Sequence, residues 1–412
     1  MRDSWSYTKK VIGLGFIALW VVVAINFLVD PFDIFPSPKI TGVNFVKTEI
    51  AKQMRLTKAF QLRQALPEVV MVGNSRVEVA LDPRHPVLRQ YSSSIYNIGL
   101  PGGTLYEALR YLQHAHQLAP IKLAILGLDR NMFTSESESG FDEDILATAP
   151  VGRKNLYPVL NIVRTLMSLD TLSTSINTVM NQHQPVSIQF RADGMRLPES
   201  ADYAVKKAGG SLRNFRREMA AQLANHAEEP MDPKIAFGYF RQILDFCRAN
   251  RIDLRLFIHP VHTWAMEIEQ QLGQSDASRK WRREIVNVVT EEAGNHYPPF
   301  PLWDFSSYNI ITTEQLPSGE DHDTQMKYYW EPRHYKKFVG DLILDRMFKY
   351  QDSARVLPED FGILLNDANL DDWEEKIQKS RNAYVMTHAS DIAEIGRLIQ
   401  ASRSRKLRAR EN

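Results

Sequence analysis

Val69-Val70-Met71-Val72-Gly73-Asn74-Ser75-Arg76 is the stretch that decides how the rest of the chain is interpreted. Four apolar residues between Pro67 and a Gly-Asn-Ser turn predict a short buried strand. Gly73 permits a tight turn, and a serine just past the carboxyl end of such a strand stands where open α/β sheets bind their ligands. Most serines in this position are ordinary helix caps, so Ser75 needs a partner before it indicates catalysis.

That partner occurs far along the chain, in Trp330-Glu331-Pro332-Arg333-His334-Tyr335. Serine is a poor nucleophile until a neighbouring base takes its proton, and the base works best when a third group orients it. A spacing of three residues lets Glu331 and His334 face each other or a common target. We therefore expect Ser75, His334 and Glu331 to form a catalytic triad. The alternative is that His334 caps a following helix and Glu331 favours the positive end of its dipole.

Composition narrows the possible functions. The 412 residues are enough for one large domain with insertions or for two domains. The 50 basic and 49 acidic residues leave a net charge of +1, which gives no support for a nucleic-acid partner. The single cysteine, Cys247, excludes an internal disulfide and a metal site built from cysteines.

An apolar stretch from Val11 to Val29 predicts a membrane anchor. At about 1.5 Å per residue it spans roughly 28 Å, enough for one crossing. Basic residues precede it and Asp30 and Asp33 follow it, so the positive-inside rule makes residues 1–30 a cytoplasmic tip and anchor. We expect a single-pass protein of the inner (cytoplasmic) membrane whose bulk is periplasmic or otherwise extracytoplasmic. A cleaved signal peptide is the alternative, although no small-x-small cleavage pattern precedes Asp30.

Strands and helices alternate after Pro67. Residues 94–99 and 122–128 predict further strands, and Thr104 with Glu107 forms a capping box that starts a helix between them. This order is a βαβ unit, which implies a parallel sheet with right-handed crossovers. Later strands are predicted near residues 254–258 and 300–305, and later helices near residues 235–247 and 278–292 and just after His334.

The predicted domain limits follow from where this alternation starts and stops. Residues 31–66 contain an extended, proline-rich spacer and a helix over 47–66. Residues 67–350 form the α/β domain. The alternation is lost over about 134–231, which we interpret as an insertion lying over the sheet, with a loop over 135–144 and helical sequence over 156–180. Residues 351–412 predict a helical C-terminal tail.

The two motifs resemble those of a known family. Gly73-Asn74-Ser75 stands where the SGNH (GDSL-type) hydrolases carry Gly-Asp-Ser, and Glu331-Pro332-Arg333-His334 stands where they carry Asp-x-x-His. The resemblance covers roughly residues 67–348 without the insertion. With its anchor the chain looks most like the extracytoplasmic branch, which includes alginate-type O-acetyltransferases and the D-alanyl transfer proteins of teichoic acid modification. The resemblance implies a flavodoxin-like three-layer α/β fold with Ser75 as nucleophile, His334 as base and Glu331 as orienting acid.

The chain departs from the family at its acid and at its nucleophile block. Asn74 replaces an aspartate that is not the catalytic acid, so this change should matter little. Glu331 replaces an aspartate, and its longer side chain must dock differently on His334.

A third departure concerns the oxyanion hole. The family's Gly-x-Asn-Asp block is replaced by Gly127-Leu128-Asp129-Arg130-Asn131. We expect the hole to use the backbone N–H of Ser75 and that of Gly99 or Gly102, with Asn131 as a further candidate donor.

Five polar residues are candidates for the wall of the same cleft. His259 and His262 follow a predicted strand, and their i, i+3 spacing also suggests a metal, but no third ligand is near in sequence. Asp304 ends another strand and is the reserve candidate for the triad acid. Arg76 either holds the nucleophile turn or contacts an anionic substrate, and Asp129 ends the strand at 122–128. We predict no metal and no cofactor.

The sequence thus favours a serine esterase or O-acyltransferase that acts on acyl esters of a cell-surface or exported polysaccharide. Its expected partners are the glycan or acyl-donor substrate, the membrane and a membrane-bound acyl-transfer protein. The alternative is a catalytically degenerate scaffold subunit of a polysaccharide assembly complex, which the missing Gly-x-Asn-Asp block and the large insertion favour.

Overall fold

The apolar stretch before Ser75 forms β1 (Val69–Val72), which lies inside a six-stranded sheet in the computed structural model. The strand order is β2-β1-β3-β4-β5-β8; the first five strands are parallel and β8 is antiparallel at the edge. The other strands are β2 (Ile95–Asn97), β3 (Leu123–Leu128), β4 (Asp253–Ile258), β5 (Leu302–Asp304) and β8 (Ile363–Leu365). This order of the parallel strands is common in doubly wound sheets, which bind ligands beyond the carboxyl ends of their strands.

Both faces of the sheet are covered by helices, which is why β1 is apolar throughout. Val70 and Val72 point to one face and Val69 and Met71 to the other, as alternation along a strand requires. The first face is packed by α2 (Met54–Ala65), α4 (Leu105–Leu118), α9 (Lys234–Ala249), α11 (Ser275–Ala293) and α13 (Leu370–Thr387). The second is packed by α3 (Ser75–Ala80), α10 (Thr263–Gln271), α12 (Lys337–Phe348) and α14 (Ala389–Glu411). The predicted α/β class with a mostly parallel sheet is confirmed.

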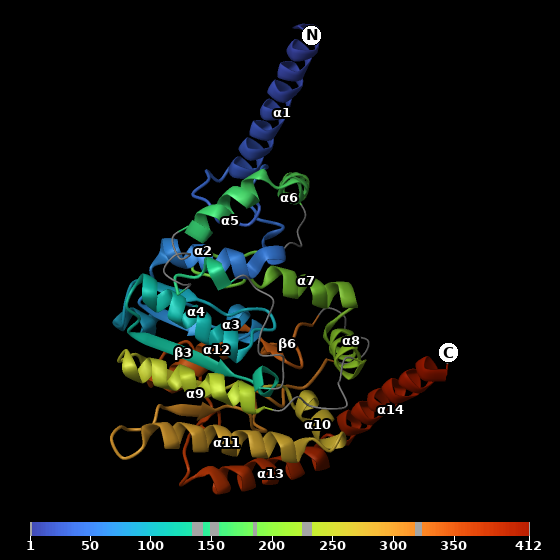
Figure 1. Ribbon diagram of the computed structural model, residues 1–412. Helices are drawn as coiled ribbons and strands as arrows, with labels where there is room; N and C mark the ends of the chain where they lie inside the picture. The colour runs from blue at the N-terminus through green and yellow to red at the C-terminus, as the bar shows by residue number, and fades with distance from the viewer. Residues whose placement is uncertain are drawn as a thin grey trace.

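The predicted anchor is helical. α1 (Arg2–Val29) contains the one span in the described part of the chain that is long and apolar enough to cross a membrane, Trp5–Val29. Only 6 % of its most apolar stretch is buried, so it is unlike the core helix of a soluble protein. The helix projects away from the α/β domain (Figure 1).

The segment after α1 is packed rather than extended. Phe32, Ile34 and Phe35 are buried in a cluster with Phe60 of α2. The Asp30 carboxylate accepts hydrogen bonds from the backbone N–H groups of Ile34 and Phe35, at 3.0 and 3.1 Å, which folds the chain back on itself. The helix predicted over 47–66 is shorter: a 3₁₀ turn, η1 (Ile50–Gln53), precedes α2.

The structure describes residues 2–133, 143–148, 156–183, 188–224, 233–317 and 324–411, so most of the predicted loop over 135–144 lies outside it. The helical sequence over 156–180 forms two helices, α5 (Leu156–Met167) and α6 (Leu169–Met180), because Ser168 caps the second one by accepting the N–H of Thr171. These two helices pack on α1, whereas α7 (Glu199–Ala208) and α8 (Ser211–Ala224) pack near the α/β domain (Figure 1). The insertion therefore does not lie over the sheet as one layer.

Residues 351–412 are integrated into the α/β domain and are not a simple helical tail. They contribute β8, which pairs with β5, and α13, whose Leu370 and Trp373 are buried in the core. Ile395 and Ile399 of α14 are buried on the other face. Because β8 has only three residues, its sequence carries too little alternation to predict a strand.

The short elements that complete the fold are η2 (Pro86–Gln90), η3 (Arg130–Phe133), η4 (Glu143–Ile145), β6 (Tyr329–Glu331) and β7 (His334–Tyr335). The last two form an antiparallel hairpin that carries the second predicted motif.

Candidate active site

Ser75 is placed by a turn that only glycine can make. Gly73 has a φ of +151°, and a Cβ there would lie 2.6 Å from Val77 Cγ2 and 3.1 Å from the carbonyl oxygen of Gly127. Asn74 is extended and caps α3, because its side-chain oxygen accepts the N–H of Arg76 at 3.0 Å. Ser75 is therefore the first residue of α3, at the carboxyl end of β1.

Glu331 and His334 are placed by the β6–β7 hairpin. Its register pairs Glu331 directly with His334, so both side chains lie at one end of the hairpin. The hairpin is tied to the nucleophile helix by Arg76, whose Nε–H donates to the carbonyl oxygen of Arg333 at 2.7 Å. The alternative in which His334 caps the next helix does not describe this structure, since α12 starts after Lys336 and no side chain caps it.

The three predicted triad residues form one hydrogen-bonded chain. Ser75 Oγ lies 2.7 Å from His334 Nε2, and His334 Nδ1 contacts Glu331 Oε1. A carboxylate is an acceptor only, so Nδ1 carries the proton and Nε2 is free to accept the proton of the Ser75 hydroxyl. This tautomer is the one that general-base activation of a serine requires.

The surroundings of Glu331 favour its ionised form. Burial raises the pKa of the Glu331 carboxyl, but the charge and hydrogen bond of His334, the N–H of Arg333 and the charge of Arg76 outweigh it and lower the pKa below its usual value. The Arg333 N–H donates to Glu331 Oε2 at 3.1 Å. Glu331 is therefore a carboxylate at neutral pH, able to orient His334 and to stabilise its protonated form.

Asp304, the reserve acid, is occupied elsewhere. Its carboxylate accepts hydrogen bonds from Arg282 Nε at 2.8 Å and from Trp373 Nε1 at 2.9 Å, and it also accepts the N–H of Ser306. It is fully buried among these donors. We correct that reserve assignment: Asp304 ties β5 to α11 and α13, and it is not the partner of His334.

His262 also has a structural role. It caps α10 by accepting the N–H of Trp264 at Nδ1, and its Nε2–H donates to the carbonyl oxygen of Glu314 at 2.8 Å. It does not belong to the cavity wall described below. Of the two histidines, only His259 lies in that wall.

The expected oxyanion donors are only partly available. The N–H of Gly99 already donates to the side-chain oxygen of Asn97 at 2.9 Å, so Gly99 is removed as a donor. Gly99 is instead required for packing, since a Cβ there would lie 2.4 Å from the backbone nitrogen of Glu78. The remaining backbone candidates are Ser75 and Gly102. Ser75 starts α3, and the first N–H groups of a helix have no acceptor within the helix. Gly102 has a φ of +63°.

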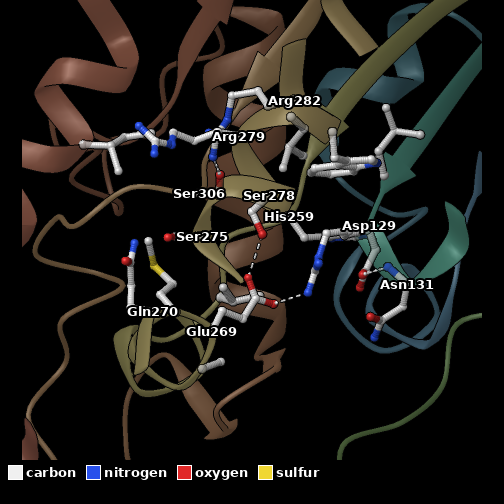
Figure 2. Close-up of a pocket in the computed structure, with 18 of the residues that line it drawn as sticks. Asp129, Asn131, His259, Glu269, Gln270, Ser275, Ser278, Arg279, Arg282 and Ser306 are labelled. Atoms are coloured by element: carbon white, nitrogen blue, oxygen red, sulfur yellow. Dashed lines mark hydrogen bonds and ion pairs between the residues drawn. The ribbon is translucent and has the colours of Figure 1, made fainter. Parts of the chain in front are cut away.

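A cavity of about 160 Å³ is lined by residues at the ends of β3 and β4 and by residues of α10 and α11, and Figure 2 shows part of this lining. Arg76 and Arg333, the sequence neighbours of Ser75 and His334, lie in its wall, although neither triad residue does. The wall contains five arginines and three carboxylates: Arg76, Arg130, Arg279, Arg282 and Arg333, with Asp129, Glu269 and Glu374. Cationic side chains are therefore in excess there.

Two of the predicted cleft residues hold the nucleophile turn. Asp129 follows β3, and its carboxylate forms an ion pair with Arg76 and accepts a hydrogen bond from Asn74 Nδ2 at 3.2 Å. Burial lowers the pKa of Arg76 to about 10, which still leaves it charged. Asn131 lies in η3 on the cavity wall, and its N–H donates to Asp129 Oδ1 at 2.8 Å.

His259 lies in the cavity wall as a neutral side chain. It is buried, and burial together with the charges of Arg76 and His334 keeps its pKa well below the usual value. Its Nδ1 lies 2.8 Å from the Tyr335 hydroxyl, whereas Nε2 has no hydrogen-bond partner within the described residues. A Cβ on Gly127 would lie 2.6 Å from this Nε2, so Gly127 makes room for the ring.

Sequence reasoning missed a buried ion pair beneath the site. Lys58 of α2 donates to the carbonyl oxygens of Asn97, Gly99 and Gly194, and its Nζ lies 3.7 Å from Glu78. Glu78 is one turn after Ser75 on α3 and is fully buried, and burial raises its pKa. The one signal in the sequence is the position of Glu78, three residues after the nucleophile.

Among the described residues, no group of three or more His, Cys, Asp or Glu side chains is arranged to hold a metal ion. Comparisons with protein-family models, with curated proteins and with solved structures found no match to this chain. The resemblance seen in the sequence therefore stays a prediction.

Proposed function

We propose that this protein is a membrane-anchored, extracytoplasmic serine esterase or O-acyltransferase of the SGNH type, acting on acyl esters of a cell-surface or exported polysaccharide. The observation that carries the proposal is the hydrogen-bonded chain Ser75–His334–Glu331. Supporting it are the parallel sheet order and the position of Ser75 at the carboxyl end of β1. The glycan and the compartment rest on the family resemblance and on the charges that flank α1.

The proposed reaction uses only groups of this chain and its substrates. Ser75 Oγ attacks the ester carbonyl carbon as its proton passes to His334 Nε2, and Glu331 stabilises the imidazolium. The negative oxygen of the tetrahedral intermediate is stabilised by backbone N–H groups, for which Ser75 and Gly102 are the candidates. Collapse of the intermediate expels the alcohol, which takes the proton from His334, and leaves an acyl-Ser75. Water then releases an acid, or a sugar hydroxyl takes the acyl group.

The cavity beside the triad favours a substrate with an anionic part. Arg333 lies in the cavity wall, and burial lowers the pKa of its guanidinium although the charges of Glu269 and Glu331 act in the opposite direction. Burying a cation is costly, and a carboxylate or phosphate group of the substrate would offset part of that cost. Arg333→Ala should therefore raise the KM for an anionic ester much more than for a neutral one, whereas equal effects on both would remove this specificity.

A reactive-serine probe tests the proposal. A fluorophosphonate should label the full-length protein in membranes, and Ser75→Ala should abolish the label. Ser275→Ala is the matched control, because Ser275 lies in the cavity wall but outside the triad. Absence of labelling in the folded wild-type protein, or labelling that persists in Ser75→Ala, would contradict it.

The second candidate is a scaffold subunit of a polysaccharide assembly complex with a degenerate site. The observation that favours it is the hydrogen bond that occupies the Gly99 N–H, one of the expected oxyanion donors. A folded protein whose Ser75 does not react with the probe would support this second function.

A further inference from the structure

The two helices next to the membrane anchor have an unusually apolar outer surface. Residues 156–180 contain only two charged residues, Arg164 and Asp170. Nine large apolar side chains on α5 and α6 are exposed: Leu156, Val159, Leu160, Val163, Met167, Leu169, Ile176, Val179 and Met180. Scattered apolar residues are normal on a protein surface, but a contiguous apolar patch usually indicates a binding surface.

This surface is joined to the end of the membrane-spanning helix. Asn26, three residues before the end of the Trp5–Val29 span, is fully buried. Its Nδ2 donates to the carbonyl oxygens of Leu166 and Ser168, at 2.9 and 3.0 Å, and its Oδ1 accepts the Ser175 hydroxyl at 3.0 Å. In Figure 1, α5 and α6 accordingly lie beside the end of α1 nearest the domain. Both helices are thus fixed beside the carboxyl-terminal end of this span.

The inner side of α5 is already packed against the domain. Ile162 and Leu166 contact the buried cluster of Phe32, Ile34, Phe35 and Phe60. The exposed residues are therefore the opposite side of helices that are anchored on the domain. Both helices contact α1, whose own apolar side chains are also exposed, so an apolar medium around α1 would adjoin their exposed side.

We propose that α5 and α6 lie in the interfacial layer of the same bilayer that α1 spans, with their exposed apolar side chains among the lipid acyl chains. Helices with one strongly apolar side bury it at the boundary between headgroups and acyl chains. The occupant of this surface is thus lipid. Residues 156–180 would then act with α1 as two attachments that fix the orientation of the α/β domain, and hence of Ser75, relative to the membrane. This inference does not depend on catalysis by Ser75.

Site-directed fluorescence on the full-length protein in phosphatidylcholine–phosphatidylglycerol vesicles tests this. The only native cysteine, Cys247, is buried, so single cysteines can be labelled selectively. Val163→Cys and Ile176→Cys place a bimane label on the apolar surface, at positions that are 43 % and 49 % exposed. Leu364→Cys is the matched control, because Leu364 is 45 % exposed on β8, far from α1 in sequence.

We expect doxyl-labelled lipids to quench the labels at positions 163 and 176, and aqueous iodide to quench the label at position 364. Labels at 163 and 176 that respond to iodide as the control does would overturn the proposal. So would labels at 163 and 176 that are shielded from both quenchers, because that result would indicate a protein occupant, such as a second copy of this chain. Unchanged thermal unfolding of each variant verifies that the fold is retained.

Discussion

At the scale of single residues, the hydrogen-bonded contact of Ser75, His334 and Glu331 was predictable because each motif is a local signal. A strand, a glycine turn and a serine are adjacent in sequence, and Glu331 and His334 are three residues apart, so only the pairing of the two motifs needed a resemblance. Lys58 and Glu78 gave no such signal, because a buried charge and a surface charge look alike in sequence. Gly99 was assigned the wrong role, since only the structure reveals that its N–H donates to Asn97.

The assignment of Glu331 as the orienting acid leads to the first prediction. Glu331→Gln should lower turnover of an activated ester about 10⁴-fold, the typical effect of neutralising a triad acid, because the amide no longer selects the productive tautomer of His334. Asp304→Asn should change turnover far less and should mainly lower the thermal stability, since Asp304 binds Arg282 and Trp373. The opposite pattern would return the acid role to Asp304.

At the scale of elements, long apolar or periodic segments were predicted well and short ones were not. Strands near 69–72, 122–128 and 254–258 and the capping box of α4 occur as expected. The helical sequence over 156–180 is divided because Ser168 offers its side chain to the backbone, an interaction that periodicity does not report. The histidine after β4 illustrates the same limit: His262 is a helix cap and not a cleft residue.

This cap gives a prediction of pH dependence. Burial lowers the pKa of His262 to about 4, below its ordinary value of 6.5, so the folded protein requires the neutral ring. The stability that depends on this neutral ring is fully present above about pH 6.5 and is lost as the pH falls towards 4. His262→Asn retains a good capping side chain but does not titrate, so its free energy of unfolding should fall less steeply between pH 6.5 and 4. If the free energy of unfolding depended on pH in the same way in the wild type and the variant, His262 would have the same pKa in the folded and unfolded states.

At the scale of the whole molecule, the sequence indicated the α/β class and the anchor but misplaced the limits of the domain. Charge asymmetry around α1 leads to a topology prediction. Lys9 and Lys10 precede the apolar span and Asp30 and Asp33 follow it, so the C-terminus should lie outside the cytoplasm. A full-length fusion with alkaline phosphatase at the C-terminus should therefore be active. A fusion with a fluorescent protein that matures only in the cytoplasm should be dark. A bright fluorescent fusion with inactive phosphatase would reverse the orientation and would remove the extracytoplasmic substrate.

The C-terminal residues provide the last prediction, because β8 and α13 extend the α/β domain beyond residue 350. Trp373 of α13 is only 3 % exposed, packs in the core and donates its indole N–H to Asp304. Trp373→Ala should therefore cost about 3–5 kcal/mol of unfolding free energy, as large-to-small core changes do. Met386 lies on the same helix and is 84 % exposed, so Met386→Ala should change the stability by no more than about 0.5 kcal/mol. Denaturant titration of both variants in detergent measures the difference. Equal, small effects would contradict a stabilising role for Trp373; the expected contrast would show that α13 stabilises the domain whose sheet carries Ser75.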